Sequence, residues 1–161
     1  MSLENREFLQ EVMRKEIKDR KIPLSLGKTC PVKCTFCYEM DHSYRQTFDM
    51  PLTTQEDWDF ILNEIRAFPT RATESWVLGG NEYMEWTDLA LHPKAMDWIE
   101  EFLEKTDKNI IMFSVGYFDP KRINRLAEKY PGRINFELSV ITLGGYRKQL
   151  MPKGPSVNQV L

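Results

Sequence analysis

The three cysteines of the chain lie within eight residues, as Cys30-Pro-Val-Lys-Cys34-Thr-Phe-Cys37. Thiolates are soft ligands that iron–sulfur clusters select, and a cluster normally takes four of them. No other cysteine occurs in the 161 residues, so a four-iron cluster bound here would keep one iron open to a ligand that is not protein. The spacing therefore predicts a metal centre with one open position at Cys30, Cys34 and Cys37.

His42 provides an alternative, because it follows Cys37 by five positions and would complete a Cys3His zinc site. Under this alternative the protein is a zinc-stabilised interaction module without catalysis. Small zinc modules usually pair their ligands across two knuckles, whereas all three cysteines here share one loop, which favours the cluster. Uncoordinated or redox-active cysteines are a third interpretation, and an odd number of cysteines disfavours a disulfide framework.

The composition indicates one globular domain. A hydrophobic content of 42% and a charged content of 29% are ordinary for soluble proteins, and no apolar run approaches the ~18 residues of a membrane span. The charged N-terminus lacks the apolar stretch of a signal peptide, so we expect a cytoplasmic protein with no membrane partner. A net charge of -2 argues against broad binding to a nucleic-acid backbone.

Helical and strand patterns alternate along the first half of the chain. An N-terminal helix is expected from Asn5 to Lys21, ended by Pro23, with the apolar stripe Phe8, Leu9, Val12, Met13 and Ile17. A short first strand at Leu24–Leu26 then runs into the cysteine loop. Thr53-Thr54-Gln55-Glu56 has the pattern of a capping box. It predicts a second helix, closed by Pro69, with the core residues Trp58, Ile61, Leu62 and Ile65.

The second half repeats the alternation. A strand at Trp76–Leu78 breaks at Gly79-Gly80, and a helix opening at Pro93 is expected to bury Met96, Ile99, Phe102 and Leu103. A strand at Ile110–Phe113 precedes Asp119-Pro120, an N-cap followed by proline, and a helix with the core residues Ile123, Leu126 and Ala127. A fourth strand is expected from Ile134 to Ile141. This alternation predicts βαβ units and a parallel sheet.

The expected fold class is α/β: a partial (β/α) barrel of about four βα units with a curved parallel sheet. It would form a single domain over residues 1–161, with an N-terminal helix in 1–22 and the βα units in 23–161. A complete barrel has eight units and roughly 250 residues, so the domain is expected to be truncated at its C-terminal side or completed by another copy. The fourth strand would then leave an open edge for self-association.

The cysteine triplet, with Phe36 before Cys37 and a strand just upstream, resembles the radical S-adenosylmethionine (radical SAM) superfamily. The resemblance covers about Leu24 to Met151 and implies a radical SAM type of barrel. It also implies a [4Fe-4S] cluster whose open iron binds the amino and carboxylate groups of S-adenosylmethionine. An electron from an external flavodoxin- or ferredoxin-type donor then cleaves the sulfonium. The resulting 5'-deoxyadenosyl radical abstracts hydrogen from a small-molecule or peptide substrate that the sequence does not identify.

The resemblance also implies cofactor contacts. Gly79-Gly80-Asn81-Glu82 follows the second strand, where the family places a GGE-type turn against the methionine amino group; here Asn81 separates Gly80 from Glu82. Phe36 and Tyr38 flank the last cysteine, where the family brings an aromatic residue and its backbone to the adenine.

Two serines complete the expected cofactor site. Ser114 ends the third strand, where the family often has a polar contact to the methionine end. Ser139 lies in the fourth strand, at the position of a ribose contact, and Glu137 on the same strand face is the alternative. Gly79, Gly80, Ser114 and Ser139 are expected to line one cleft. Without the cysteines, the glycines would be interpreted as a strand-ending turn and the serines as ordinary strand residues. His92 is interpreted as a helix-entry residue.

Overall fold

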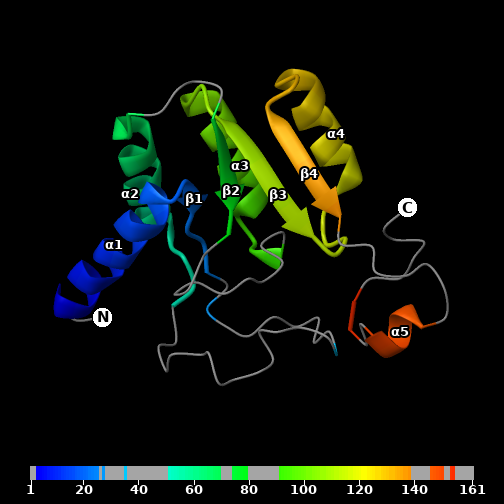
Figure 1. Ribbon diagram of the computed structural model, residues 1–161, viewed down its shortest axis with the longest axis horizontal. Helices are drawn as coiled ribbons and strands as arrows, with labels where there is room; N and C mark the ends of the chain where they lie inside the picture. The colour runs from blue at the N-terminus through cyan, green and yellow to red at the C-terminus, as the bar shows by residue number, and fades with distance from the viewer. Residues whose placement is uncertain are drawn as a thin grey trace.

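The computed structural model describes residues 3–25, 27, 35, 51–69, 74–79, 91–138, 146–150 and 153–154 (Figure 1). Its four strands are all parallel and adjoin in the order β1-β2-β3-β4. They are β1 (Lys21–Ile22), β2 (Ser75–Leu78), β3 (Asn109–Ser114) and β4 (Ile134–Leu138). Sequence order and spatial order therefore coincide, as expected for consecutive βα units.

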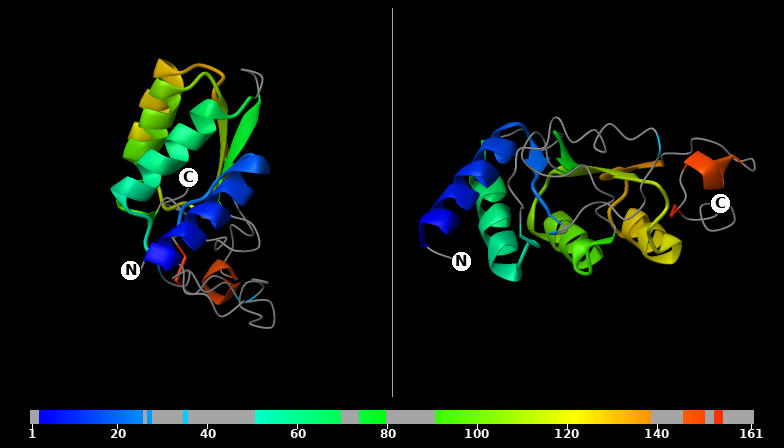
Figure 2. Two further views of the ribbon diagram at one scale, coloured as in Figure 1. Left: turned by 90° about the vertical axis from the view of Figure 1, so that its left-hand side faces the viewer. Right: turned by 90° about the horizontal axis from the view of Figure 1, so that it is seen from below.

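The helices within the described residues are α1 (Leu3–Lys18), α2 (Gln55–Ala67), α3 (Ala95–Lys105), α4 (Pro120–Lys129) and α5 (Arg147–Leu150). Figure 2 shows α2, α3 and α4 side by side on one face of the sheet. A doubly wound sheet carries helices on both faces. Helices α2, α3 and α4 lie on one face only, as in a partial βα barrel, where every helix packs on the outside of the sheet. Among the described residues, no helix has the length and apolar content needed to cross a membrane.

The start of the chain differs from the prediction. Helix α1 ends at Lys18 rather than Lys21. Arg20 adopts a positive φ of 59°, and the amide of Arg20 donates to Ile17 O at 2.9 Å. This left-handed residue reverses the chain, so the first strand occupies Lys21–Ile22 instead of beginning at Leu24. The helix is therefore ended by the turn at Arg20 and not by Pro23.

Helix α1 packs beside α2. Its buried stripe contains Leu9, Val12, Met13 and Ile17, as predicted. Phe8 is 45% exposed, so its predicted place in the core is wrong: it lies at the margin of the stripe. Arg14 links the two helices, since its Nε lies 3.4 Å from Glu64 Oε1 and its guanidinium lies 4.9 Å from the centre of the Phe60 ring.

Helix α2 begins with a capping box one residue later than predicted. Thr54, not Thr53, is the N-cap: its Oγ1 accepts from the amide of Asp57 at 3.2 Å, and the Asp57 carboxylate accepts from the amide of Thr54 at 2.9 Å. Thr53 is buried and bonds to Ser25 instead. The predicted core residues of α2 are all buried, and Trp58 stacks on Trp98 of α3 with ring centres 5.2 Å apart.

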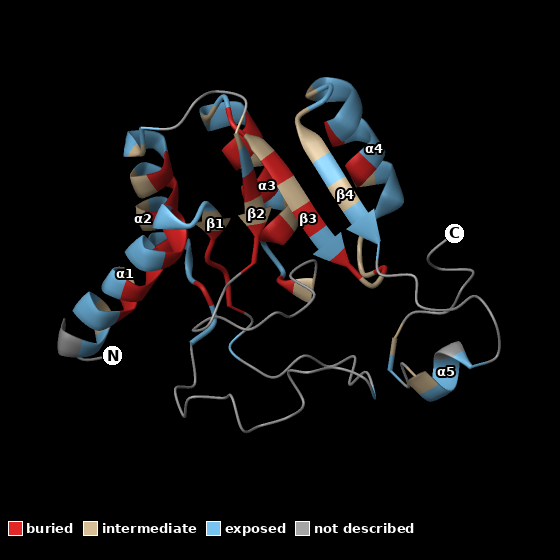
Figure 3. Cartoon of the chain, in the orientation of Figure 1, coloured by how far each residue is buried: buried red, intermediate tan, exposed pale blue. Residues whose placement is uncertain are grey.

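The core between helices and sheet is deepest at β2 and β3 (Figure 3). Trp76, Leu78, Ile110 and Met112 point into it, together with the predicted residues of α3, although Met96 is only partly buried. Alternate residues therefore face the helices, and the residues between them form the opposite face of the sheet, which we call the open face.

The β4 flank is less covered. Ile123 and Leu126 of α4 are buried, but Ala127, predicted to be in the core, is exposed. Arg122 reaches Asp97 of α3, and at 100° per residue Ala127 lies on the side of α4 away from α3. No described helix packs on that side. The prediction for Ala127 was wrong because the periodicity of apolar residues identifies a helix face but does not show how much of that face a neighbouring element covers.

Candidate functional site

The carboxyl ends of the four strands meet at one edge of the sheet, because all strands are parallel. We call it the carboxyl edge; it is marked by Ile22, Leu78, Ser114 and Leu138. Ligands of parallel βα folds bind beside this edge. The predicted cysteines, Gly79, Gly80, Ser114 and Ser139 all belong to strand ends or to segments that follow them. Of the predicted site residues, the structure describes Gly79 and Ser114. The others lie outside the described residues: Cys30, Cys34, Cys37, Phe36, Tyr38, Gly80, Glu82 and Ser139.

The two ends of the cysteine-bearing segment are joined at this edge. The Ser25 amide donates to Thr53 Oγ1 at 2.7 Å, and the Thr53 amide donates to Ser25 O at 3.1 Å. Both residues are buried. This pair, called the Ser25–Thr53 clamp, closes residues 26–52 into a loop with its base beside the end of β1.

Gly27 lies just inside the clamp, where the backbone conformation and the space available both exclude a side chain. Its φ is +64°, and a Cβ built on it would lie 2.5 Å from the backbone nitrogen of Leu52. Its amide donates to Ser25 Oγ at 3.0 Å. Glycine is therefore needed both for the backbone conformation and for the close approach of the two loop ends.

His92 connects the clamp to the next loop along the chain. It is 4% exposed, and its Nε2 lies 3.2 Å from Thr53 O while its Nδ1 accepts from the Lys94 amide at 3.1 Å. Burial lowers the pKa of the imidazole below its usual value of 6.5, although the bond to Thr53 acts in the opposite direction. His92 was interpreted from the sequence as a helix-entry residue, and no local pattern distinguishes this bridging role.

Gly79 follows β2 directly, as predicted. It is buried, its φ is 139°, and its amide donates to Ile22 O at 3.2 Å. The positive φ lets the chain turn away at the end of β2, a conformation that glycine adopts at little cost. The backbone of the first glycine thus lies beside the end of β1, next to the start of the cysteine-bearing segment.

Ser114 ends β3, as predicted, and is buried on the face that the helices cover. Its Oγ accepts from the amides of Gly116 at 2.9 Å and Tyr117 at 3.2 Å. These bonds stabilise the turn that follows the strand. The contact of Ser114 with a cofactor stays a prediction.

The open face of the sheet presents a mixed surface. Val77, Ile111 and Asn135 lie in register across β2, β3 and β4, and Phe113 pairs with Glu137 nearer the carboxyl edge. Phe113 is 39% exposed. Glu137, the alternative to Ser139, therefore lies on the open face. The other residues of this face were not identified as site residues from the sequence.

A second contact involves the middle of the cysteine segment. Thr35, the residue after Cys34, donates from its amide to Leu150 O at 2.8 Å, and its Oγ1 lies 3.3 Å from the same oxygen. The Tyr117 hydroxyl donates to the carbonyl of Lys153. The short helix α5 and its continuation thus bridge the turn after β3 and the cysteine segment.

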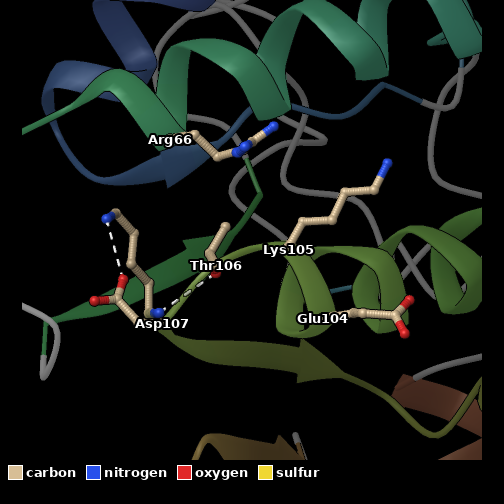
Figure 4. Close-up of a pocket in the computed structure, with 6 residues that line it drawn as sticks. Arg66, Glu104, Lys105, Thr106 and Asp107 are labelled. Atoms are coloured by element: carbon tan, nitrogen blue, oxygen red, sulfur yellow. Dashed lines mark hydrogen bonds and ion pairs between the residues drawn. The ribbon is translucent and has the colours of Figure 1, made fainter.

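A shallow polar pocket of about 310 Å³ lies at the opposite edge of the sheet (Figure 4). Its lining residues come from the ends of α2 and α3 and the connection into β3: Arg66, Glu104, Lys105, Thr106, Asp107 and Lys108. These residues precede β3, so the pocket lies at the amino edge, where parallel βα folds do not place their catalytic groups. We therefore do not assign the function to it.

The chemistry of the donor set decides which metal centre suits the carboxyl edge. Within the described residues, no three His, Cys, Asp or Glu side chains gather as a metal site, and the three cysteines and His42 lie outside them. Three thiolates carried on one clamped loop fit a cluster that needs a fourth, non-protein ligand. Searches against protein-family models, curated proteins and solved structures gave no match to this chain.

Proposed function

We propose that this protein is a radical SAM enzyme in which Cys30, Cys34 and Cys37 hold a [4Fe-4S] cluster. The observation that carries the proposal is the CxxxCxxC triplet without a fourth cysteine, on a segment whose base is clamped at the end of β1. The one-sided helix layer and the strand order support a partial (β/α) barrel of radical SAM type. In such a barrel the carboxyl edge is the catalytic side.

S-adenosylmethionine is the proposed ligand of the open iron. When bound, the cluster supplies the electron for reductive cleavage of the sulfonium, which starts hydrogen abstraction from a substrate. The backbone of Gly79 and Gly80 would approach the methionine amino group, with Glu82 as a further contact. Phe36 and Tyr38 would bind the adenine, and Ser139 would contact the ribose. Ser114 would act at the methionine end through the turn after β3 that its Oγ stabilises.

The open face supplies a wall for the reaction chamber. Val77, Ile111 and Phe113 would exclude water from it, which protects a reactive intermediate from side reactions. Asn135 and Glu137 add polar groups on the same face, with 3.5 Å between Asn135 Nδ2 and Glu137 Oε1. A chamber wall with adjacent apolar and polar areas suits a substrate that has both apolar and polar groups, either a small molecule or a peptide.

Anaerobic reconstitution with iron and sulfide tests the proposal. A brown protein with about four irons and four sulfides per chain is expected. A colourless protein that takes one zinc, and loses it when His42→Ala is introduced, would establish the zinc-stabilised module instead. Arg125→Ala, an exposed position on α4, is the control and should leave metal uptake unchanged.

The enzyme would be cytoplasmic, because its cluster needs a reducing compartment, and would take electrons from an external flavodoxin- or ferredoxin-type protein. A second copy would associate along β4, on the side where no described strand extends the sheet and where Leu138 is 37% exposed. Size-exclusion chromatography with light scattering is expected to show a dimer; a monomer at every concentration would contradict the association.

A further inference from the structure

His92 lies where two loops of the carboxyl edge come together. It follows the connection from β2 to α3, which starts at Gly79, and its ring packs against Trp98 with centres 4.6 Å apart. The Lys94 amide donates to its Nδ1, so Nδ1 carries no proton. The proton is therefore on Nε2, which donates to Thr53 O at 3.2 Å.

Thr53 belongs to the other loop, as one half of the Ser25–Thr53 clamp. A single series of hydrogen bonds thus runs from Ser25 through Thr53 to His92, and all three residues are buried. The series joins the base of residues 26–52, which carry the cysteines, to the end of residues 79–91, which carry Gly80 and Glu82.

We infer that His92 is a positioning residue that fixes the base of residues 26–52 against the end of residues 79–91, so that the two segments depend on each other through the Ser25–Thr53 clamp. Its role towards a cofactor rests on the proposed function, whereas the coupling of the two loops does not.

A purely packing role does not account for these contacts. The stack on Trp98 needs an aromatic ring, which phenylalanine would also provide. Burying an imidazole carries a desolvation cost, and the two polar bonds offset it only while both partners stay in place. The side chain is thus specific for the arrangement of Thr53 and Lys94 rather than for the apolar core.

Hydrogen exchange of the metal-free protein tests the coupling directly. His92→Phe keeps the ring and removes both bonds, and His92→Gln keeps a donor near the Nε2 position. Peptides from residues 26–52 and 80–91 should exchange about tenfold faster in the Phe variant, in both loops together, while the Gln variant stays near the wild type. Thr106→Val is the matched control: it removes the 2.7 Å bond to Phe102 O at the amino edge and should leave both loops unchanged.

Each other outcome overturns the inference. Equal exchange in the wild type and the Phe variant, acceleration of one loop alone, or full exchange of both loops in the wild type would show that the two loops are independent. If His92→Phe does not fold, His92→Asn replaces it, because asparagine is too short to reach Thr53 O. The Asn variant should then show the faster exchange of both segments.

Reconstituted protein separates this inference from the proposed function. The Phe variant should lose iron to a chelator faster than wild type and bind S-adenosylmethionine more weakly, with rescue by His92→Gln. A wild type that takes up no iron would refute the proposed function, while the exchange measurement would still decide the coupling.

Discussion

The two edges of the sheet are held by different kinds of bond. At the amino edge the Arg133 guanidinium donates to the carbonyls of Leu103, Thr106 and Lys108, at 2.7, 3.0 and 2.5 Å. At the carboxyl edge the bonds of the Ser25–Thr53 clamp and of His92 are between neutral groups. Charge-assisted bonds are roughly twice as strong as neutral ones, so among the contacts of the described residues those at the amino edge are the stronger.

The lengths of the connections differ in the same way. Short turns join α3 to β3 and α4 to β4 at the amino edge, whereas residues 26–52 and 79–91 leave the carboxyl edge as long segments. Binding and catalytic groups are concentrated in loops positioned by a rigid scaffold. We therefore expect substitutions at the amino edge to change the stability of the fold, and substitutions at the carboxyl edge to change cofactor binding.

The largest effect is expected at the carboxyl edge from Cys34→Ser. Loss of one of three thiolates should abolish stable cluster binding, because two cysteines cannot hold the cluster in place of three. The free energy of unfolding of the metal-free protein should change by less than about 0.5 kcal/mol. Iron analysis and urea unfolding measure the two quantities. Unchanged iron content would contradict the assignment of Cys34.

Arg133→Leu should give the opposite pattern at the amino edge. Three carbonyls lose a charged donor, so the free energy of unfolding should fall by about 2–4 kcal/mol. Iron uptake of the folded fraction should be unaffected. Arg125→Leu, an exposed position on α4, is the control and should change stability by less than about 0.5 kcal/mol. Equal effects of the two substitutions would show that Arg133 does not secure this edge.

Two glycines compare the edges at similar backbone conformations. Gly27 and Gly132 have φ of +64° and +73°, but a Cβ on Gly27 would meet the Leu52 backbone, whereas one on Gly132 would meet nothing within 4 Å. Gly132→Ala should cost about 1 kcal/mol, and Gly27→Ala about 2–3 kcal/mol with weaker iron retention. Thermal unfolding of both variants measures the difference, and equal losses would contradict a tight clamp.

The smallest expected effect concerns pH. The pKa of His92 is lowered in the folded protein, so the unfolded chain binds a proton first as the pH falls below about 6.5. Stability due to neutral His92 is complete above that pH and is lost as the pH falls toward the pKa of the folded state. His92→Gln should flatten the stability profile in this window. The free energy of unfolding is measured with urea at several values from pH 7 to pH 5. The same dependence on pH in the wild type and in His92→Gln would show that the pKa of His92 is not lowered in the folded protein.

Much of the scaffold was predictable from local patterns. The apolar stripe of α2 identified its core face, and Asp119-Pro120 marked the start of α4, where the Asp119 carboxylate caps the Lys121 amide. The sequence also indicated β2 and β3 to within one residue at each end. These features depend on contacts within a few residues, which sequence periodicity records.

Features that depend on distant neighbours were not predictable. Arg20 adopts a positive φ that its residue type does not favour, so the end of α1 and the position of β1 were misplaced. Thr53 was assigned as an N-cap because its bond to Ser25 is not visible in the sequence. The bridging role of His92 was missed for the same reason, and the candidate site was predicted by residue type rather than by its supporting contacts.

Electron paramagnetic resonance of the reduced, reconstituted protein, with and without S-adenosylmethionine, tests directly whether a cluster with an open iron is present. We expect a [4Fe-4S] signal that changes when S-adenosylmethionine is added, because the ligand would bind the iron that no cysteine occupies. Cys34→Ser should show neither the signal nor the change. A cluster signal that S-adenosylmethionine leaves unaltered, or a protein that takes up zinc and no cluster, would show that this protein is not a radical SAM enzyme.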